Sequence, residues 1–190
     1  IETWFDPLPF YAEPLEVQAT DTRQYPLAAV TQRPMAMYHS WDSQNAWLRQ
    51  IHAHNYLFIN ARTARLAGID DGDWIWVESQ WGKVRCMARH SEAVEPGTVW
   101  TWNAIGKAAG AWNLTPDANE SKLGFLLNHV ISEELPAGNA RISNSDPITG
   151  QAAWYDVRVR ISKVSTTDTR AGTSPGETAP GLQTSSPQFE

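Results

Sequence analysis

Residues 58–88, FINARTARLAGIDDGDWIWVESQWGKVRCMA, contain the signals that decide the fold. An apolar run leads into Asn60, which can cap a short helix that stops at Gly68. The letters IDDGD then predict a turn. Two strands, WIWVES and KVRCMAR, follow on either side of a second turn at residues 80–82. Strand, helix and hairpin in such close succession predict a β-rich fold with short connections.

Further strands are predicted on both sides of this stretch. Short apolar runs at 26–30 and 55–60 suit buried strands. A Pro-Gly turn opens the strand in EPGTVWTWN, residues 95–103. In AWYDVRVRI, residues 153–161, apolar and charged residues alternate as in a strand with one buried face. About six strands in all favour a closed barrel over an open sheet.

A second helix is predicted over residues 119–135, NESKLGFLLNHVISEEL. Its apolar residues fall on one stripe at helical spacing, and they are Leu123, Leu126, Leu127, Val130 and Ile131.

Composition limits the class of protein. The 190 residues fit one domain with a real core, and no run of about 18 apolar residues could insert into a membrane. A net charge of −6 argues against nucleic acid as a partner. Cys86 is the only cysteine, so neither an internal disulfide nor a Cys-rich metal frame can form. Its place within a strand predicts an inert core thiol.

The two ends differ from the middle. Residues 1–24 are rich in proline and aromatic residues and predict an extended N-terminal arm that lies on something else. Residues 164–190 are mostly Ser, Thr, Pro and Gly and predict an irregular C-terminal tail. The predicted barrel domain therefore spans residues 25–163.

Residues 31–50, TQRPMAMYHSWDSQNAWLRQ, form the most polar segment that follows a buried strand. Pro34 cannot continue a central strand, so the segment is predicted to leave the barrel as a loop. Asp42 or Ser43 is then predicted to cap a short helix through Ile51. Varied hydrogen-bonding groups are available here for a ligand: Arg33, His39, Ser40, Gln44 and Asn45. The alternative is a surface loop that is tied by its own side chains.

Three other segments carry weaker signals. In WTWNAIGKAAG, Asn103, Gly106 and Lys107 follow a strand end, where glycine allows close backbone approach. The segment SNSDPITGQ, residues 143–151, is a turn by composition, although its amide side chains could contact a heterocycle. His52 and His54 could begin a metal site, but they lack a third ligand, so no metal is expected. No nucleophile and base stand together, which favours a binding domain with no catalytic residues of its own.

Three ordered blocks carry a resemblance to a known family: YPLAAVTQRPMAMYHS, then residues 58–88, then SDPITGQAAWYDVRVRI. Together they resemble the C-terminal molybdopterin-dinucleotide-binding domain of the dimethyl sulfoxide reductase family. Within that family the loop motifs look most similar to polysulfide and thiosulfate reductases and to cytoplasmic sulfite dehydrogenases. The resemblance implies a mainly β fold, a six-stranded double-psi β-barrel with short inserted helices. It also implies a cofactor, bis(molybdopterin guanine dinucleotide), whose molybdenum or tungsten is held mainly by the rest of the enzyme.

Matching by position, the resemblance implies that the cofactor contacts lie in the segments already singled out. These contacts are Thr31, Arg33, His39, Ser40, Asn45, Asn103, Gly106, Lys107 and Gln151, with Asn128 and Asn144 as looser matches. The resemblance implies no catalytic residue and no metal ligand in the chain, which would not be catalytic alone.

The implied partners are the remainder of a molybdoenzyme catalytic subunit plus an iron–sulfur electron-transfer subunit, with or without a membrane-anchor subunit. The implied substrate is an inorganic sulfur compound that undergoes two-electron transfer. A cytoplasmic location is expected, with the periplasm as the alternative. A different class of protein, a Trp-rich carbohydrate- or peptide-binding module, predicts several solvent-facing Trp in one row. A small barrel with its own catalysis is disfavoured by the lack of a nucleophile–base pair.

Overall fold

The computed structural model describes residues 11, 13–38, 41–42, 45–103, 105–106, 124–146, 149–152 and 156–165. The barrel strands are β1 (Leu27–Gln32), β2 (Tyr56–Ile59), β3 (Trp74–Glu78), β4 (Lys83–His90), β5 (Thr98–Trp102) and β8 (Val157–Lys163). The helices are α1 (Leu15–Gln18), α2 (Ala46–Ile51), α3 (Ala61–Leu66) and the 3₁₀ helix η3 (Leu127–Val130). A hairpin of β6 (Glu134–Ala137) and β7 (Ala140–Ser143) lies outside the barrel.

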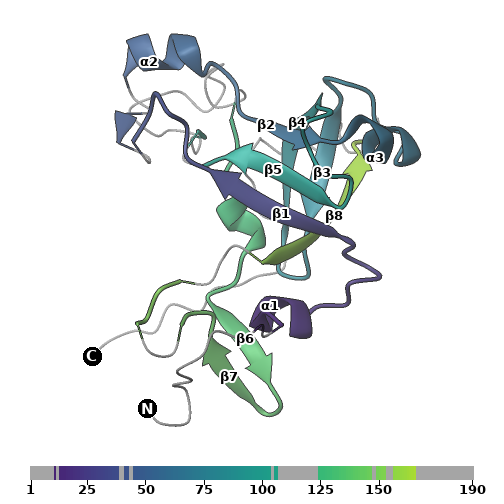
Figure 1. Cartoon of the computed structure of the whole chain (residues 1–190), viewed down its shortest axis with the longest axis vertical. Helices are drawn as coiled ribbons and strands as arrows, with labels where there is room; N and C mark the ends of the chain where they lie inside the picture. The colour runs from purple at the N-terminus through teal and green to yellow at the C-terminus, as the bar shows by residue number, and fades with distance from the viewer. Residues whose placement is uncertain are drawn as a thin grey trace.

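The six barrel strands close in the order β1-β5-β2-β4-β3-β8. The pairs β1–β5 and β2–β4 are parallel, and the other four pairs are antiparallel. Parallel neighbours need a crossover connection, so strands far apart in sequence become adjacent. The predicted closed six-stranded barrel is confirmed, and Figure 1 shows α2 and α3 at opposite sides of it.

The core follows the predicted alternation along the strands. In β4 the buried residues are Val84, Cys86 and Ala88, and in β8 they are Val157 and Val159. Leu57, Ile59, Ile75 and Val99 are fully buried with them. Because their side chains meet inside the closed sheet, burial of apolar area at roughly 25 cal/mol per Å² is the main stabilising term of the barrel.

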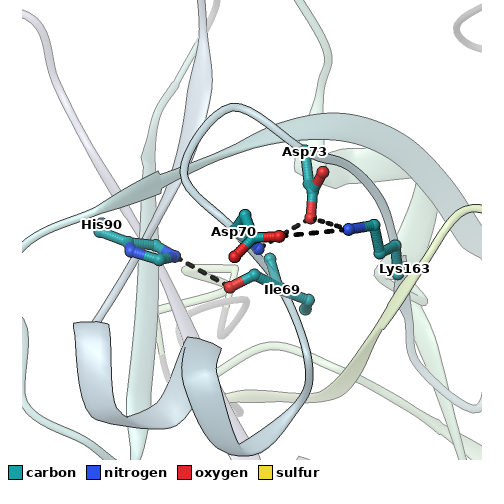
Figure 2. A network of polar contacts seen from close by, with 5 residues as sticks. All are labelled: Ile69, Asp70, Asp73, His90 and Lys163. Carbon is teal, nitrogen blue, oxygen red and sulfur yellow. Dashed lines mark hydrogen bonds and ion pairs between the residues drawn. The ribbon is translucent and has the colours of Figure 1, made fainter.

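One side of the barrel ends at helix α3, and the sequence signals there are confirmed. The Asn60 side chain accepts a hydrogen bond from the Arg62 backbone N–H, and Gly68 follows the helix with a φ of 66°. The next turn is held by ion pairs: Lys163 Nζ lies 2.6 Å from Asp73 Oδ2 and 3.5 Å from Asp70 Oδ2 (Figure 2). This side of the barrel, from α3 to Lys163, is called the α3 end below.

The opposite side of the barrel is where β1 and β5 stop and β2 begins. It is called the Asn103 end below, after the residue that follows β5. The 3₁₀ helix η3 covers part of it, since Leu127 and Val130 are buried in the core and the Ser79 hydroxyl donates to the Val130 carbonyl over 2.7 Å. The β3–β4 turn belongs to the same end.

The predicted helix over residues 119–135 is wrong in its described part. Residues 124–126 are irregular, η3 covers only four residues, and Glu134 begins a strand. Of the described residues of the apolar stripe, Leu127 and Val130 are buried, but against the barrel end and not along an α-helix. Gly124 shows the physical reason: its backbone lies close to Ile105 and Gly106, so tertiary contacts, and not the local pattern, set the path of this segment.

Helix α2 begins later than predicted. Asn45 is the N-cap, and its side-chain oxygen accepts hydrogen bonds from the backbone N–H groups of Trp47 and Leu48. Asp42 instead accepts from the Tyr38 N–H over 2.9 Å and so tightens the preceding loop. Ser43 lies outside the described residues.

The predicted N-terminal arm contains helix α1, which carries a buried carboxylate. The Glu16 side chain is 2% exposed and accepts from Trp81 Nε1 over 2.7 Å. Asn144 Nδ2 approaches the same carboxylate at 3.4 Å. Helix α1 therefore joins the β3–β4 turn to the segment after β7.

Aromatic rings cover much of the outer barrel surface over β2 and β5. Phe58 and Trp100 stack with centroids 4.1 Å apart, and Trp102 meets Trp100 edge-on at 4.9 Å. Cations from β4 lie over the Trp rings of β3, with Lys83 over Trp76 and Arg85 over Trp74. These Trp residues are buried or half-buried, so the strands do not present the exposed Trp row expected of a binding module. Among the described Trp residues, Trp41 and Trp47 are the exposed ones.

Candidate functional site

The barrel interior becomes polar in its last layer at the Asn103 end. Ala29 on β1 and Val99 on β5 point inward and pair in register, and two residues further the inward pair is Thr31 and Thr101. Asn55 precedes β2 and is 3% exposed. Because burying a hydroxyl or an amide costs free energy unless it is hydrogen-bonded, such a layer needs partners.

Asn55 obtains its partners from within the chain. Its Nδ2 donates to the Trp102 carbonyl over 2.9 Å and to the Phe125 carbonyl over 3.1 Å. Its Oδ1 accepts from the Thr101 hydroxyl over 2.9 Å. Asn55 thus ties β2 to the end of β5 and to the segment before η3. This residue was not predicted from the sequence, although a polar residue directly before a buried strand is a usable signal.

Three polar atoms of residues at this end lack partners among the described residues. They are Thr31 Oγ1, His54 Nδ1 and Asn103 Oδ1, all buried. A buried polar atom without a hydrogen bond costs roughly 1–3 kcal/mol, and most native ones are satisfied. Atoms of this kind at the Asn103 end are where a further group could complete the hydrogen bonds.

Thr31 and Asn103 are brought together by strand pairing. Gln32 lies opposite Trp102 in the parallel β1–β5 ladder. The Asn103 backbone N–H donates to the Gln32 carbonyl over 2.7 Å and fixes the first residue beyond β5. Thr31 and Asn103 therefore lie on neighbouring chain segments at the same end of the barrel, and their role in one site stays a prediction.

Gly106 makes a close backbone approach, as predicted, but to the protein itself. A Cβ atom at Gly106 would lie 2.7 Å from the Phe125 carbonyl carbon, and one at Gly124 would lie 2.6 Å from the Ile105 carbonyl oxygen. The two segments therefore touch backbone to backbone. Gly124 was missed in the sequence, where it sat inside the predicted helix.

Of the other cofactor contacts predicted in and near the loop after β1, two are exposed and the rest lie outside the described residues. Arg33 is exposed directly beyond β1, at the Asn103 end. Asn45 is exposed and uses its side-chain oxygen to cap α2. His39, Ser40 and Lys107 lie outside the described residues.

The remaining three predicted contacts lie on other segments. Asn128 is exposed in η3, and Gln151 is exposed in a turn whose backbone pairs Asp146 with Gln151. Asn144 is buried, donates to the Ser132 carbonyl over 3.1 Å and reaches Glu16. No hydrogen bond among the described residues joins Asn144 to Thr31 or Asn103; its Nδ2 makes the contacts with Glu16 and Ser132, while its buried Oδ1 has no partner among the described residues.

Burial raises the pKa of three described titratable groups, Glu16, Asp156 and Cys86. Burial raises the pKa of Glu16, against the lowering effect of its hydrogen bond from Trp81. Burial also raises the pKa of Cys86, which stays a thiol in the core. The histidines considered for a metal do not share a strand face, because His52 ends α2 and packs against Trp102. Within the described ranges, no three His, Cys, Asp or Glu side chains are placed to hold a metal ion.

The chemistry of the Asn103 end fits a heteroaromatic ligand. The side-chain oxygen Oδ1 of Asn103 can accept a hydrogen bond from a ring N–H or an amino group, and the Thr31 hydroxyl can donate or accept one. The exposed guanidinium of Arg33 matches the geometry of a phosphate. Pterin and guanine edges with a linking pyrophosphate carry the complementary groups, so these residues fit the dinucleotide that the resemblance implies.

Comparisons with known proteins give the same assignment. Residues 27–154 match the family model described as Molydopterin dinucleotide binding domain. Over 165 residues the chain is 72% identical to a sulfite dehydrogenase subunit of Allochromatium vinosum, covering 86% of this chain and 17% of that protein. It is 32% identical over 78 residues to the thiosulfate reductase molybdopterin-containing subunit PhsA of Salmonella typhimurium, covering 41% of this chain and 10% of that protein.

A solved structure shares the fold. Acetylene hydratase from Pelobacter acetylenicus superposes with a TM-score of 0.63 at 23% identity, covering 86% of this chain and 22% of that one. The chain thus spans a small part of the length of its relatives. The predicted resemblance, including that to sulfite dehydrogenases, is confirmed. From the matched residues 27–154 and the barrel, the chain belongs to the molybdopterin dinucleotide-binding domain family.

Proposed function

We propose that the chain holds one face of bis(molybdopterin guanine dinucleotide) at the Asn103 end of the barrel. The observation that carries this is the pair of buried, unpartnered oxygen atoms of Thr31 and Asn103 on adjacent strand ends. They would bond the heterocycle, and Arg33 would pair with a phosphate. His39, Ser40, Asn45, Gly106 and Lys107 stay predicted contacts near this point, with Asn128, Asn144 and Gln151 as outlying ones.

An exposed apolar surface beside this end suits the remainder of a catalytic subunit. Large apolar side chains of the loop after β1 and of α2 face solvent: Met35, Tyr38, Trp41, Trp47 and Ile51. Met35 is fully exposed and Trp47 is 79% exposed. Exposed apolar groups gathered in one segment mark an interaction site. The chain covers only 17% of its 72% identical relative, so most of such a subunit remains to cover them.

For the whole enzyme we propose a molybdenum oxidoreductase that acts on an inorganic sulfur compound, sulfite first. The support is that two of its relatives are a sulfite dehydrogenase subunit and a thiosulfate reductase subunit. The redox chemistry would be supplied by the metal on the cofactor, while this chain binds and orients the dinucleotide. An iron–sulfur subunit would take the electrons, and the cytoplasm is the proposed compartment. None of the described helices has the length and apolarity to cross a membrane.

The test uses the assembled enzyme with Asn103→Ala. We expect the guanine nucleotide to dissociate about ten-fold faster, the effect of one lost buried hydrogen bond. Nucleotide and molybdenum remaining after repeated buffer exchange are the readouts. The matched control is Asn139→Ala, since Asn139 is exposed in the β6–β7 turn. Equal retention in both variants would remove Asn103 from the binding site.

A further inference from the structure

Asn55 holds both flanks of Asn103 with a single side chain. On one flank it bonds the carbonyl of Trp102, the residue directly before Asn103. On the other flank it bonds the carbonyl of Phe125. Phe125 in turn lies against Gly106, three residues beyond Asn103. The backbone around Asn103 is therefore held at Trp102 directly, and at Gly106 through Phe125, by the side-chain amide of Asn55. This backbone is called the Asn103 path below.

Among the described residues, two other sets of contacts fix the Asn103 path. The Asn103 N–H bond to Gln32 sets the backbone at its start, where the β1–β5 ladder ends. Beyond it, Ile105 and Gly106 are located by their contact with Gly124 and Phe125. Both Nδ2 hydrogens of Asn55 are used, and Thr101, which is fully buried, orients the amide from the other side.

We propose that Asn55 is a positioning residue for the dinucleotide. It does not touch the ligand, but it fixes the position of the side-chain oxygen Oδ1 of Asn103. This inference rests on the proposed function of the Asn103 end. A side chain that is positioned by neighbouring hydrogen bonds binds its ligand less tightly when those bonds are removed, even though the ligand contact remains.

A buried asparagine at the α3 end provides a matched control. Asn60 is 7% exposed, donates from Nδ2 to the Val94 carbonyl over 2.8 Å and caps α3. Asn55→Ala and Asn60→Ala each remove a buried amide that bonds backbone carbonyls. Both variants should lower the thermal midpoint of the enzyme. Only Asn55→Ala should alter the Asn103 end.

The experiment measures nucleotide dissociation and backbone hydrogen exchange in the assembled enzyme. We expect Asn55→Ala to release guanine nucleotide about ten-fold faster than wild type and Asn60→Ala to release it at the wild-type rate. Exchange should accelerate in the peptide that contains Asn103 for the first variant, and in the peptide that contains Asn60 for the second. If Asn55→Ala does not fold, Thr101→Val removes one anchor of the amide, and we expect about three-fold faster release.

The outcomes separate the two proposals. Equal nucleotide release from Asn55→Ala and Asn60→Ala, or from Thr101→Val and wild type, would overturn the positioning role. If Asn103→Ala releases nucleotide faster while Asn55→Ala does not, the binding site stands and positioning by Asn55 falls. If Asn103→Ala keeps its nucleotide, the proposed function itself fails.

Discussion

The two ends of the barrel differ in how completely the chain satisfies its own polar groups. At the α3 end, Asp73 and Asp70 pair with Lys163, and His90 Nε2 lies 3.1 Å from the Ile69 carbonyl oxygen (Figure 2). At the Asn103 end, buried atoms of Thr31, His54 and Asn103 have no partner in the described part of the chain. The α3 end is completed by ion pairs and hydrogen bonds within the fold, whereas the Asn103 end keeps buried polar atoms without a partner among the described residues.

This difference shows how a single barrel separates stability from binding. Unsatisfied buried groups lower the stability of the free chain. Such local costs are expected at functional sites and are offset elsewhere in a fold. Changes at the α3 end should therefore alter stability alone, while changes at the Asn103 end should alter stability and binding in separable ways.

The largest expected effect comes from Gly124→Ala at the Asn103 end. Its new Cβ would lie 2.6 Å from the Ile105 carbonyl oxygen and 2.8 Å from the Gly106 Cα. Both neighbours are backbone atoms, so the two segments must separate, at about 2–3 kcal/mol of overpacking. Denaturant unfolding of the chain measures the loss.

Gly97→Ala is the control for this substitution. Its Cβ would meet the flexible Glu95 side chain at 3.0 Å, so we expect a change within about 1 kcal/mol. Equal losses in the two variants would contradict the backbone contact between residues 105–106 and 124–125.

A matched pair of threonines tests the polar layer with a smaller effect. Thr31 and Thr101 are register partners, but only the Thr101 hydroxyl has a hydrogen bond. Thr101→Val should lose about 1 kcal/mol, because Asn55 Oδ1 loses its donor. Thr31→Val should gain up to about 1 kcal/mol in the cofactor-free chain, because an unpaired buried hydroxyl is removed. Unfolding curves of both variants give the signs, and a stability loss in Thr31→Val would mean that its hydroxyl is bonded.

How much of the fold and of the site could be predicted depends on how far apart in the sequence the interacting residues lie. The six barrel strands, the Asn60 cap and the Gly68 stop followed from local patterns, since alternation and turn chemistry lie within a few residues, whereas β6 and β7 were not predicted. The predicted helix is wrong in its described part, residues 124–135, because Leu127 and Val130 pack on a barrel end that is assembled from distant segments. Asn55 was missed for the same reason, as its partners lie 47 and 70 residues away. Asn144 matched a family position, but its contact with Glu16 spans 128 residues.

A smaller effect is expected for Glu16→Gln, as a change of pH dependence. Because burial raises the pKa of Glu16, the folded chain keeps this proton at pH values where the unfolded chain has lost it. Stability should thus be greatest below the ordinary pKa of 4.5 and fall as the pH rises through the folded pKa. Glutamine can still accept from Trp81 but does not titrate, so this slope should disappear. Unfolding free energies from pH 4 to about 7 measure it, and an unchanged slope would assign it to another group.

The smallest effect belongs to Asp73→Asn at the α3 end. The Lys163 ammonium lowers the pKa of Asp73, helped by the Asp70 backbone N–H. The stability from Asp73 is therefore complete above its ordinary pKa of 3.8 and is lost as the pH falls through the lower folded value. The pair is partly exposed to solvent, which screens it. Acid titration of the variant should show a weaker fall than wild type, and cofactor retention should not change.

The closing strand of the barrel has a consequence for how the chain is made. Strand β8 pairs with both β1 and β3, so the first barrel strand must wait for almost the last segment of the described chain. During synthesis from the N-terminus, β1 and β3 would keep open hydrogen-bonding edges while the intervening strands emerge. A ribosome that stalls before residue 157 therefore leaves a sheet prone to pair with other chains, and this stretch of synthesis is where a chaperone would be needed.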